Sequence, residues 1–277
     1  MVAALFSVLS SITFGVSDFV GGLAARRVAT LRVVVWSELI GLISIVVVAP
    51  LLGSAEISRA EIGWAAAAGM AGAGGFIFLF EGLARGRMAV VSPTTAVVGA
   101  ALPVTVGLVL GERPAPLAWA GMALALPAVW MVSSVGGDSS RRGARLEYGV
   151  AAGFGFGLFF IFMAQTSEAS GVWPLAVART TAVLVMLPLA LGRKVDLRWP
   201  RVAAWMVAFV GLGDIAANAF FLIAVRSGLI SLVAVLSSLY PVVTVLLARF
   251  VNREHLRVTQ ALGVGMSVVA VAAISLA

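Results

Sequence analysis

The sequence has no cysteine and a single histidine, His255, among its 277 residues. The lack of cysteine excludes disulfides and thiolate metal ligands, and one histidine cannot build a metal site, so we expect no cofactor. Charged residues are also scarce, at 11 % of the chain against about 25 % in soluble domains. Because apolar residues make up 61 %, the composition excludes a soluble globular protein and indicates an integral membrane protein.

Ten apolar stretches have the length of about 20 residues that an α-helix needs to cross the hydrocarbon core. The segments between them are too short for a separate fold, so we predict one all-α transmembrane domain over 1–277 with ten transmembrane helices. The stretches lie at approximately 2–24, 33–52, 60–83, 88–110, 115–135, 147–168, 172–192, 201–225, 229–248 and 257–276.

The chain matches itself when it is shifted by 142 residues. We therefore predict two five-helix repeats, over 1–136 and 146–277. An odd number of spans inverts the second repeat relative to the first, which is the pattern of alternating-access transporters. The matched pairs include Phe14/Phe156, Gly15/Gly157, Gly69/Gly211, Glu112/Glu254 and Gly121/Gly263.

Basic residues alternate between the two sets of loops. Fifteen follow the odd-numbered spans and three, Arg59, Arg113 and Arg226, occupy the other set. By the positive-inside rule the rich set is cytoplasmic and both termini are extracytoplasmic. The net charge of +7 is thus explained by membrane orientation, and no nucleic-acid partner is expected. Nearly all basic residues are arginine, which with abundant Ala, Val and Gly is typical of a GC-rich genome, so we expect a bacterial inner membrane protein.

Two motifs repeat at the end of the fourth span of each half. Gly111-Glu112 precedes Gly121, and Arg253-Glu254 precedes Gly263 and follows Tyr240-Pro241. In this order, within a 5+5 duplication, they resemble the EamA-type members of the drug/metabolite transporter superfamily. The resemblance implies a ten-helix carrier with a central cavity, in many cases an exporter of amino acids, other metabolites or toxic compounds. Members usually keep both termini in the cytoplasm, whereas the charges here predict the reverse.

Five ionisable residues fall within the predicted spans: Asp18, Glu38, Glu81, Arg179 and Asp214. Each costs roughly 2.5–3.5 kcal/mol on insertion scales and needs a partner, water or a nearby interface. Glu81 lies one turn from Arg85, so we interpret the two residues as a structural ion pair at the membrane interface.

Depth along the helices separates the remaining four. Arg179 and Asp214 both lie about 20 Å from the same membrane face, counted at 1.5 Å per residue, so a buried pair is available. Asn218 extends the polar face of Asp214 by one turn. Asp18 and Glu38 lie closer to the interface and can face each other across the first two spans. These charges have no counterpart in the other repeat, which favours a substrate or coupling-ion site over packing. Two structural alternatives stay open: a salt bridge between Arg179 and Asp214, and a hydrogen bond from Asp18 to a neighbouring helix.

Pro241 interrupts the ninth predicted span, where it removes a backbone hydrogen bond. Ser237, Tyr240 and Thr244 share or flank its helical face, so we expect a polar cavity wall there and assign Pro241 a gating role.

Two further patterns predict local structure. Ser58 and Glu61 have the spacing of a capping box at the start of the third span. Gly149, Gly153 and Gly157 recur every four residues and predict a face on which a neighbouring helix packs closely.

We therefore expect a secondary transporter rather than an enzyme. It would export a small metabolite, amino-acid-like or drug-like, by alternating access around a midplane cavity in the bilayer, with proton coupling as an option. An uptake carrier for sugars or other solutes is one alternative, and a membrane-embedded lipid-modifying enzyme is another. The sequence supports the enzyme least, because it offers no cluster of nucleophile, base and metal ligands.

Overall fold

A computed structural model describes residues 2–52, 56–85, 88–132, 143–251 and 258–276 of the chain, and regular structure in these residues is entirely helical. The α-helices are α1 (Val2–Ala25), α2 (Thr30–Val48), α3 (Arg59–Arg85), α4 (Met88–Val109), α5 (Pro116–Val132), α6 (Gly143–Met163), α7 (Trp173–Gly192), α8 (Ala204–Arg226), α9 (Ile230–Ser237), α10 (Tyr240–Val251) and α11 (Val258–Ser275). Short 3₁₀ helices lie at Ala49–Leu52, Glu168–Ser170 and Arg201–Ala203. Within these residues, six helices are long and apolar enough to cross a membrane, and four shorter apolar helices accompany them.

One predicted span is broken in the structure. The stretch 229–248 forms two helices, α9 and α10, which are separated by Ser238 and Leu239. The reason is local, because Pro241 has no N–H to donate to the carbonyl of Ser237 four residues earlier. Leu239 instead donates its N–H to Leu236 O at 3.3 Å, in a tighter turn. The other helices begin and end within a few residues of the predicted spans.

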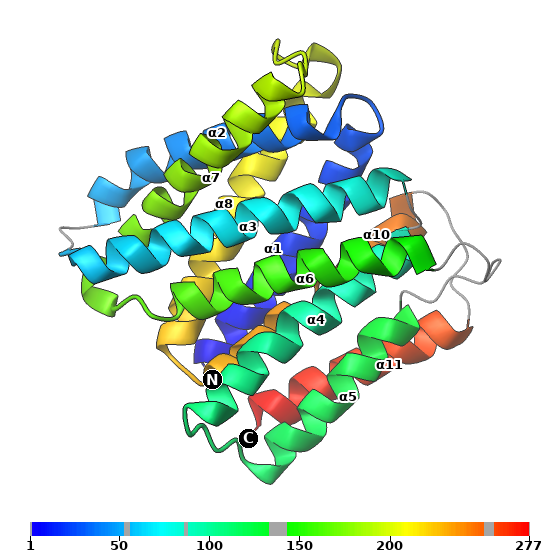
Figure 1. Ribbon diagram of the computed structural model, residues 1–277. Helices are drawn as coiled ribbons and strands as arrows, with labels where there is room; N and C mark the ends of the chain where they lie inside the picture. Colours follow the sequence, from blue (N-terminus) through cyan, green and yellow to red (C-terminus); the bar gives the residue numbers. More distant parts are fainter. Residues whose placement is uncertain (1, 53–55, 86–87, 133–142, 252–257, 277) are drawn as a thin grey trace.

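Helices from the two halves of the chain interleave in the bundle (Figure 1). α1 packs along α8 and α3 packs along α6, while α4 also lies against α6 and α5 pairs with α11. Each of these pairs joins a helix that precedes the 133–142 segment to one that follows it. Neither half therefore forms a bundle of its own.

The predicted glycine face of α6 is confirmed as a close helix contact. A Cβ added to Gly153 would lie 2.6 Å from Val98 Cβ and 2.8 Å from Thr95 O, both on α4. A Cβ on Gly149 would lie 2.7 Å from Thr94 Cβ, on the same helix. Only hydrogen at these positions lets α4 and α6 pack at this distance.

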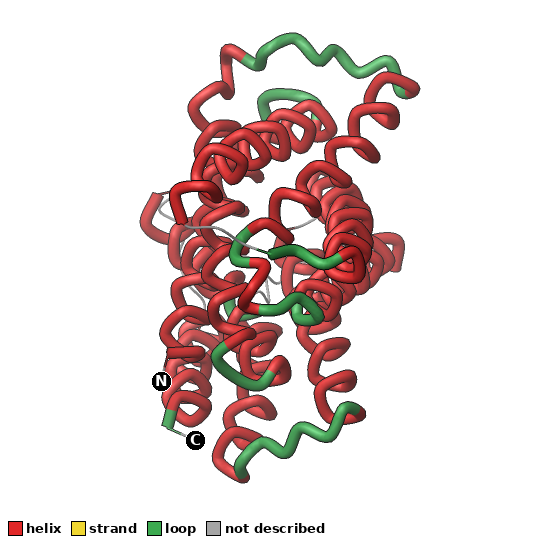
Figure 2. The backbone as a smooth tube through the Cα atoms, turned by 90° about the vertical axis from the view of Figure 1, so that its left-hand side faces the viewer, coloured by secondary structure: helices red, strands yellow, loops and turns green. Residues whose placement is uncertain are grey.

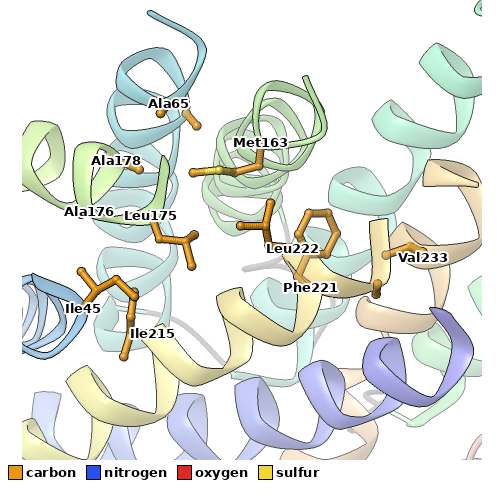
Figure 3. Packing of buried hydrophobic residues seen from close by; sticks show 12 residues of the cluster. Ile45, Ala65, Met163, Leu175, Ala176, Ala178, Ile215, Phe221, Leu222 and Val233 are labelled. Carbon is orange, nitrogen blue, oxygen red and sulfur yellow. The ribbon is translucent and has the colours of Figure 1, made fainter. Parts of the chain in front are cut away.

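The start of α1 and the end of α11 lie at the same end of the bundle, which we call the terminal end (Figure 2). The α8–α9 turn lies there too, since a Cβ on Gly228 would lie 2.7 Å from Ala3 Cβ. A hydrophobic cluster, the terminal cluster, fills the interior here. Figure 3 shows Met163 of α6 beside Leu222 and Phe221 of α8. Its buried members are Ile45, Ala65, Ala68, Met163, Leu175, Ala176, Ala178, Ile215, Phe221, Leu222, Ala224 and Val233.

The α6–α7 connection is anchored by an acidic side chain at the start of α3. Ser58 N donates to Glu61 Oε2 at 2.8 Å and Glu61 N donates to Ser58 Oγ at 3.2 Å, which confirms the predicted capping box. The other carboxylate oxygen, Oε1, accepts from Ser167 N at 2.8 Å and Ser167 Oγ at 2.7 Å. The capping residue of one helix therefore also fixes a loop of the other half.

Arg226 holds the same connection from the opposite side. At the end of α8, its Nη1 donates to Gly171 O at 2.7 Å, and its Nη2 donates to Thr166 Oγ1 and Ser170 Oγ at 3.1 Å each. Glu61 and Arg226 thus link the α6–α7 connection to α3 and to α8 at the terminal end.

The Gly111-Glu112 motif has a physical explanation at the end of α4. Gly111 has a φ of 93°, and it ends the helix with Gly111 N donating to Leu108 O at 3.1 Å and Glu112 N donating to Gly107 O at 2.9 Å. This is a Schellman motif, which favours glycine at the left-handed position. A Cβ on Gly107 would collide with the Glu112 carboxylate, so both glycines are needed to fold that side chain back over the helix.

The folded-back carboxylate caps another helix. Glu112 Oε1 accepts from Ile230 N at 2.7 Å and Oε2 accepts from Ser231 N at 3.1 Å, the first two amides of α9. A carboxylate at a helix N-terminus satisfies free N–H groups and complements the helix dipole. Glu112 thus joins the end of α4 to the start of the broken helix pair. The matching residue, Glu254, lies outside the described residues.

Candidate functional site

A cavity lies in the middle of the bundle and encloses about 760 Å³ of space between atoms, part of it open to solvent. Its wall is formed by α1, α2, α3, α4, α6, α7, α8 and the α9–α10 break. Leu175 belongs both to this wall and to the terminal cluster, so the cavity ends against packed apolar side chains on that side.

Three charged side chains meet at one side of the cavity. Arg179 Nη1 lies 2.7 Å from Glu38 Oε2, and Arg179 Nη2 forms an ion pair and hydrogen bond with Asp214 Oδ2. The residues are 3 %, 7 % and 5 % exposed for Glu38, Arg179 and Asp214, so the interaction is largely shielded from solvent. We call them the charge triad. It links α2, α7 and α8.

Close backbone contacts bring these three helices together. A Cβ on Gly211 of α8 would lie 2.6 Å from Ser37 O of α2, so these helices pack at nearly the closest possible distance. Gly41, one turn after Glu38, lies against the side chain of Arg179, with Nε 3.6 Å from a Cβ built there. The absence of a side chain at Gly41 leaves the space through which the guanidinium reaches Glu38.

Asn218 extends the charge triad along α8, as its spacing indicated. Its Nδ2 donates to Asp214 O at 2.8 Å and to Asp214 Oδ2 at 3.3 Å. The amide thus supplies a second donor to the carboxylate that Arg179 binds. Both residues line the cavity.

Asp18 also lies on the cavity wall. It belongs to α1, and a Cβ on Gly213 would collide with the side chain of neighbouring Ser17, so Asp18 stands at the level of Asp214 on an adjacent helix. Among the described residues, no hydrogen bond or ion pair to the Asp18 carboxylate is observed. Its side chain is half-buried and borders open space.

Five phenyl rings form much of the remaining wall, and sequence reasoning did not assign them. Phe76 and Phe156 meet edge to face with centroids 5.0 Å apart, and Phe159 and Phe160 do so at 5.7 Å. Phe14 and Phe160 lie 6.4 Å apart, edge to face, and join the α1 side to the α6 side. In a chain so rich in apolar residues, these rings carry no pattern that distinguishes them from rings facing lipid.

The α9–α10 break brings one of its predicted residues to the cavity. Tyr240 lines it together with Ser238, whereas Ser237 and Thr244 are not among the lining residues. The single-helix reading failed here, because the turn at the break changes which side chains face inward. Thr244 Oγ1 instead donates to Gly15 O at 3.1 Å, where α10 meets α1.

Pro241 is the second residue of α10 and stands directly after this break. The predicted partner of Glu81, Arg85, has no described side chain, so that ion pair lies outside the described residues.

Comparison with known proteins agrees with this architecture. A sequence model described as the EamA-like transporter family matches residues 1–134 and 146–276. Among solved structures, one entitled "Crystal structure of protein" superimposes with a TM-score of 0.79 at 18 % identity, over 99 % of this chain and 96 % of the other. At that identity it shows a shared fold alone. The search of curated proteins returned no match.

Proposed function

Because the chain belongs to the EamA-like transporter family, we propose that this multi-pass membrane protein is a secondary transporter that moves a small solute by alternating access. The observation that carries the proposal is the charge triad at the wall of a central cavity. Buried charges in membrane helices are costly, and a cavity between helices is where they serve a passing solute. Arg179, Asp214, Asn218, Asp18, Glu38 and Tyr240 form the proposed substrate and coupling site.

We further propose that ten helices form two inverted repeats, and reciprocal glycine contacts support this. A Cβ built on Gly15 of α1 would lie 2.6 Å from Tyr240 O, and one built on its repeat partner Gly157 of α6 would lie 3.3 Å from Gly99 O. Gly99 occupies the position that matches Pro241, one residue from the match of Tyr240. The α1–α8 and α3–α6 pairs are likewise exchanged by the 142-residue shift. Such reciprocity is expected of an internal two-fold axis.

The proposed state of the carrier is closed at the terminal end. The terminal cluster, Glu61, Arg226 and Glu112 all hold that end together. With the charge-based topology this end is extracytoplasmic, and the solute site faces the cytoplasm before export. The break before Pro241 is the proposed gating element, and protons taken up at the cavity carboxylates are the proposed driving ion.

Solute flux through reconstituted protein tests the function, and the absence of cysteine makes thiol blocking a clean assay. A Ser238→Cys variant places a thiol in the cavity wall, whereas Ser227→Cys places one on an exposed turn. A thiol reagent should stop counterflow of an accepted solute from a metabolite panel in the first variant and leave it unchanged in the second. Equal inhibition of both variants, or no flux in the folded protein, would refute the proposal.

Orientation is tested with the same Ser227→Cys variant in intact cells. A membrane-impermeant thiol reagent added from outside should label it if the terminal end is extracytoplasmic. Labelling only in inverted vesicles would place both termini in the cytoplasm and reverse the assigned direction.

A further inference from the structure

We propose that the cavity binds an organic cation with an aromatic or otherwise apolar body, and that Asp18 is its counter-ion. This inference rests on the proposed transport function and names the chemical class of the solute. The charged residues on the cavity wall are Asp18, Glu38, Arg179 and Asp214, which are three carboxylates and one guanidinium. The wall therefore has an excess of acidic groups.

The only cation of the described wall is already engaged. Arg179 is bound by Glu38 through Nη1 and by Asp214 through Nη2, and all three residues are less than a tenth exposed. A solute carboxylate or phosphate that displaced one of these partners would leave a buried carboxylate unpaired, which is strongly unfavourable. Because both carboxylates of the triad already pair with Arg179, this arginine is not free to bind an anion. The cavity is therefore unsuited to an acidic solute or to the carboxylate group of a zwitterion.

Asp18 is the carboxylate that remains for the solute. It borders the cavity next to the triad, on the adjacent helix, and it forms no ion pair with a described cation. A cation at this position would gain a direct ion pair in a site of low dielectric constant. Its affinity would therefore depend on the Asp18 charge more than on any other single side chain.

The phenyl rings supply the second half of the recognition. Phe14, Phe76, Phe156, Phe159 and Phe160 all line the cavity, and Tyr240 adds a sixth aromatic ring. Aromatic faces attract a desolvated cation and also cover the apolar body that carries it. A small hydrated ion gains little from such rings, whereas a quaternary or protonated aromatic amine gains from both the rings and the carboxylate.

Two probes of nearly equal shape and opposite charge isolate the charge preference. Tetraphenylphosphonium and tetraphenylborate differ mainly in sign, and neutral triphenylphosphine oxide reports apolar affinity alone. Equilibrium dialysis against purified protein in detergent measures the affinity of each probe, and empty micelles correct for binding to detergent. We expect saturable phosphonium binding and at least about tenfold weaker binding of the other two, the factor that 1.4 kcal/mol of charge preference produces. Equal or tighter borate binding overturns the proposal.

Matched variants locate the binding. Asp18→Asn should weaken phosphonium binding by about tenfold or more, while Asp196→Asn, an exposed aspartate at the other end, should not change it. Phe76→Leu should weaken it several-fold, while Phe78→Leu, on the same helix but 42 % exposed, should not. Phosphonium binding that survives Asp18→Asn, in a variant whose melting is unchanged, would overturn the assignment.

Flux over a panel separates failure of this inference from failure of the transport proposal. Folded protein in proteoliposomes should exchange cationic aromatic amines and not their neutral or acidic analogues. Exchange of only neutral, zwitterionic or acidic solutes would overturn the cation class and leave a transporter. Absence of exchange for every class would instead overturn the transport function on which the inference rests.

Discussion

Removing the Arg179 side chain is expected to destabilise the protein more than removing either of its partners. Arg179→Ala leaves both Glu38 and Asp214 without a counter-ion inside the bundle. Loss of one partner of a buried pair costs about 3–5 kcal/mol, and here two like-charged carboxylates remain close together. Asp214→Asn is milder, because Arg179 keeps its ion pair with Glu38 and an amide oxygen still accepts a hydrogen bond.

The second acidic partner changes what a compensating variant requires. A double variant of Arg179→Ala with Asp214→Ala still leaves Glu38 unpaired, so it should recover only part of the lost stability. Adding Glu38→Gln should restore most of it, because no unpaired charge remains in the triad. If the triad serves transport, this stable triple variant should show no flux; recovery of flux as well would assign the triad to packing alone.

Thermal unfolding in detergent, followed by tryptophan fluorescence, measures the series, and an exposed pair supplies the control. Arg32 and Asp196 form a 3.2 Å ion pair in which the aspartate side chain is 60 % exposed. Asp196→Asn should therefore change stability by at most about 1 kcal/mol. The reasoning is refuted if Arg179→Ala melts like the wild type, or if Asp214→Asn destabilises as strongly as Arg179→Ala.

Three further predictions concern the backbone. Gly153→Ala should lower the free energy of unfolding by about 1–3 kcal/mol in thermal melting, because its Cβ would meet Val98. Gly74→Ala, which has open space around it, should raise it by about 0.5–1 kcal/mol. The opposite order of stability would contradict the packing argument. Gly111→Ala should lower the free energy of unfolding by about 1–2 kcal/mol, because the φ of 93° is strained for alanine. It should also speed amide hydrogen exchange at the start of α9, which Glu112 caps. Unchanged exchange would show that the cap does not depend on this turn. Pro241→Ala should preserve folding but slow solute flux by making α9 and α10 continuous, and wild-type flux would make the break static.

Features that depend on position along one helix were predictable from the sequence. The Ser58–Glu61 capping box is a matter of spacing, and the structure shows its hydrogen bonds. The fixed rise of 1.5 Å per residue placed Arg179 and Asp214 at one depth, where the structure shows them in contact.

Features that depend on how one helix is rotated relative to its neighbours were not predictable. Glu38 completes the triad because close packing at Gly211 turns α2 toward α7 and α8, and depth alone does not give that rotation. The cavity rings, such as Phe160, were missed for the same reason. Ser237 does not line the cavity, because the turn at Leu239 breaks the helical periodicity on which its assignment relied.

The charge triad also constrains how the chain is made. Glu38 lies in the second helix to be synthesised, whereas its only described counter-ion, Arg179, lies in the seventh. An acidic side chain therefore enters the membrane long before its partner leaves the ribosome, at a cost of roughly 2.5–3.5 kcal/mol if it is ionised there. Until α7 inserts, the counter-ion that pairs with Glu38 in the folded protein is absent from the membrane. The triad can therefore be completed only after the second half of the chain is made, so the stability of α2 in the bundle depends on helices that are synthesised much later.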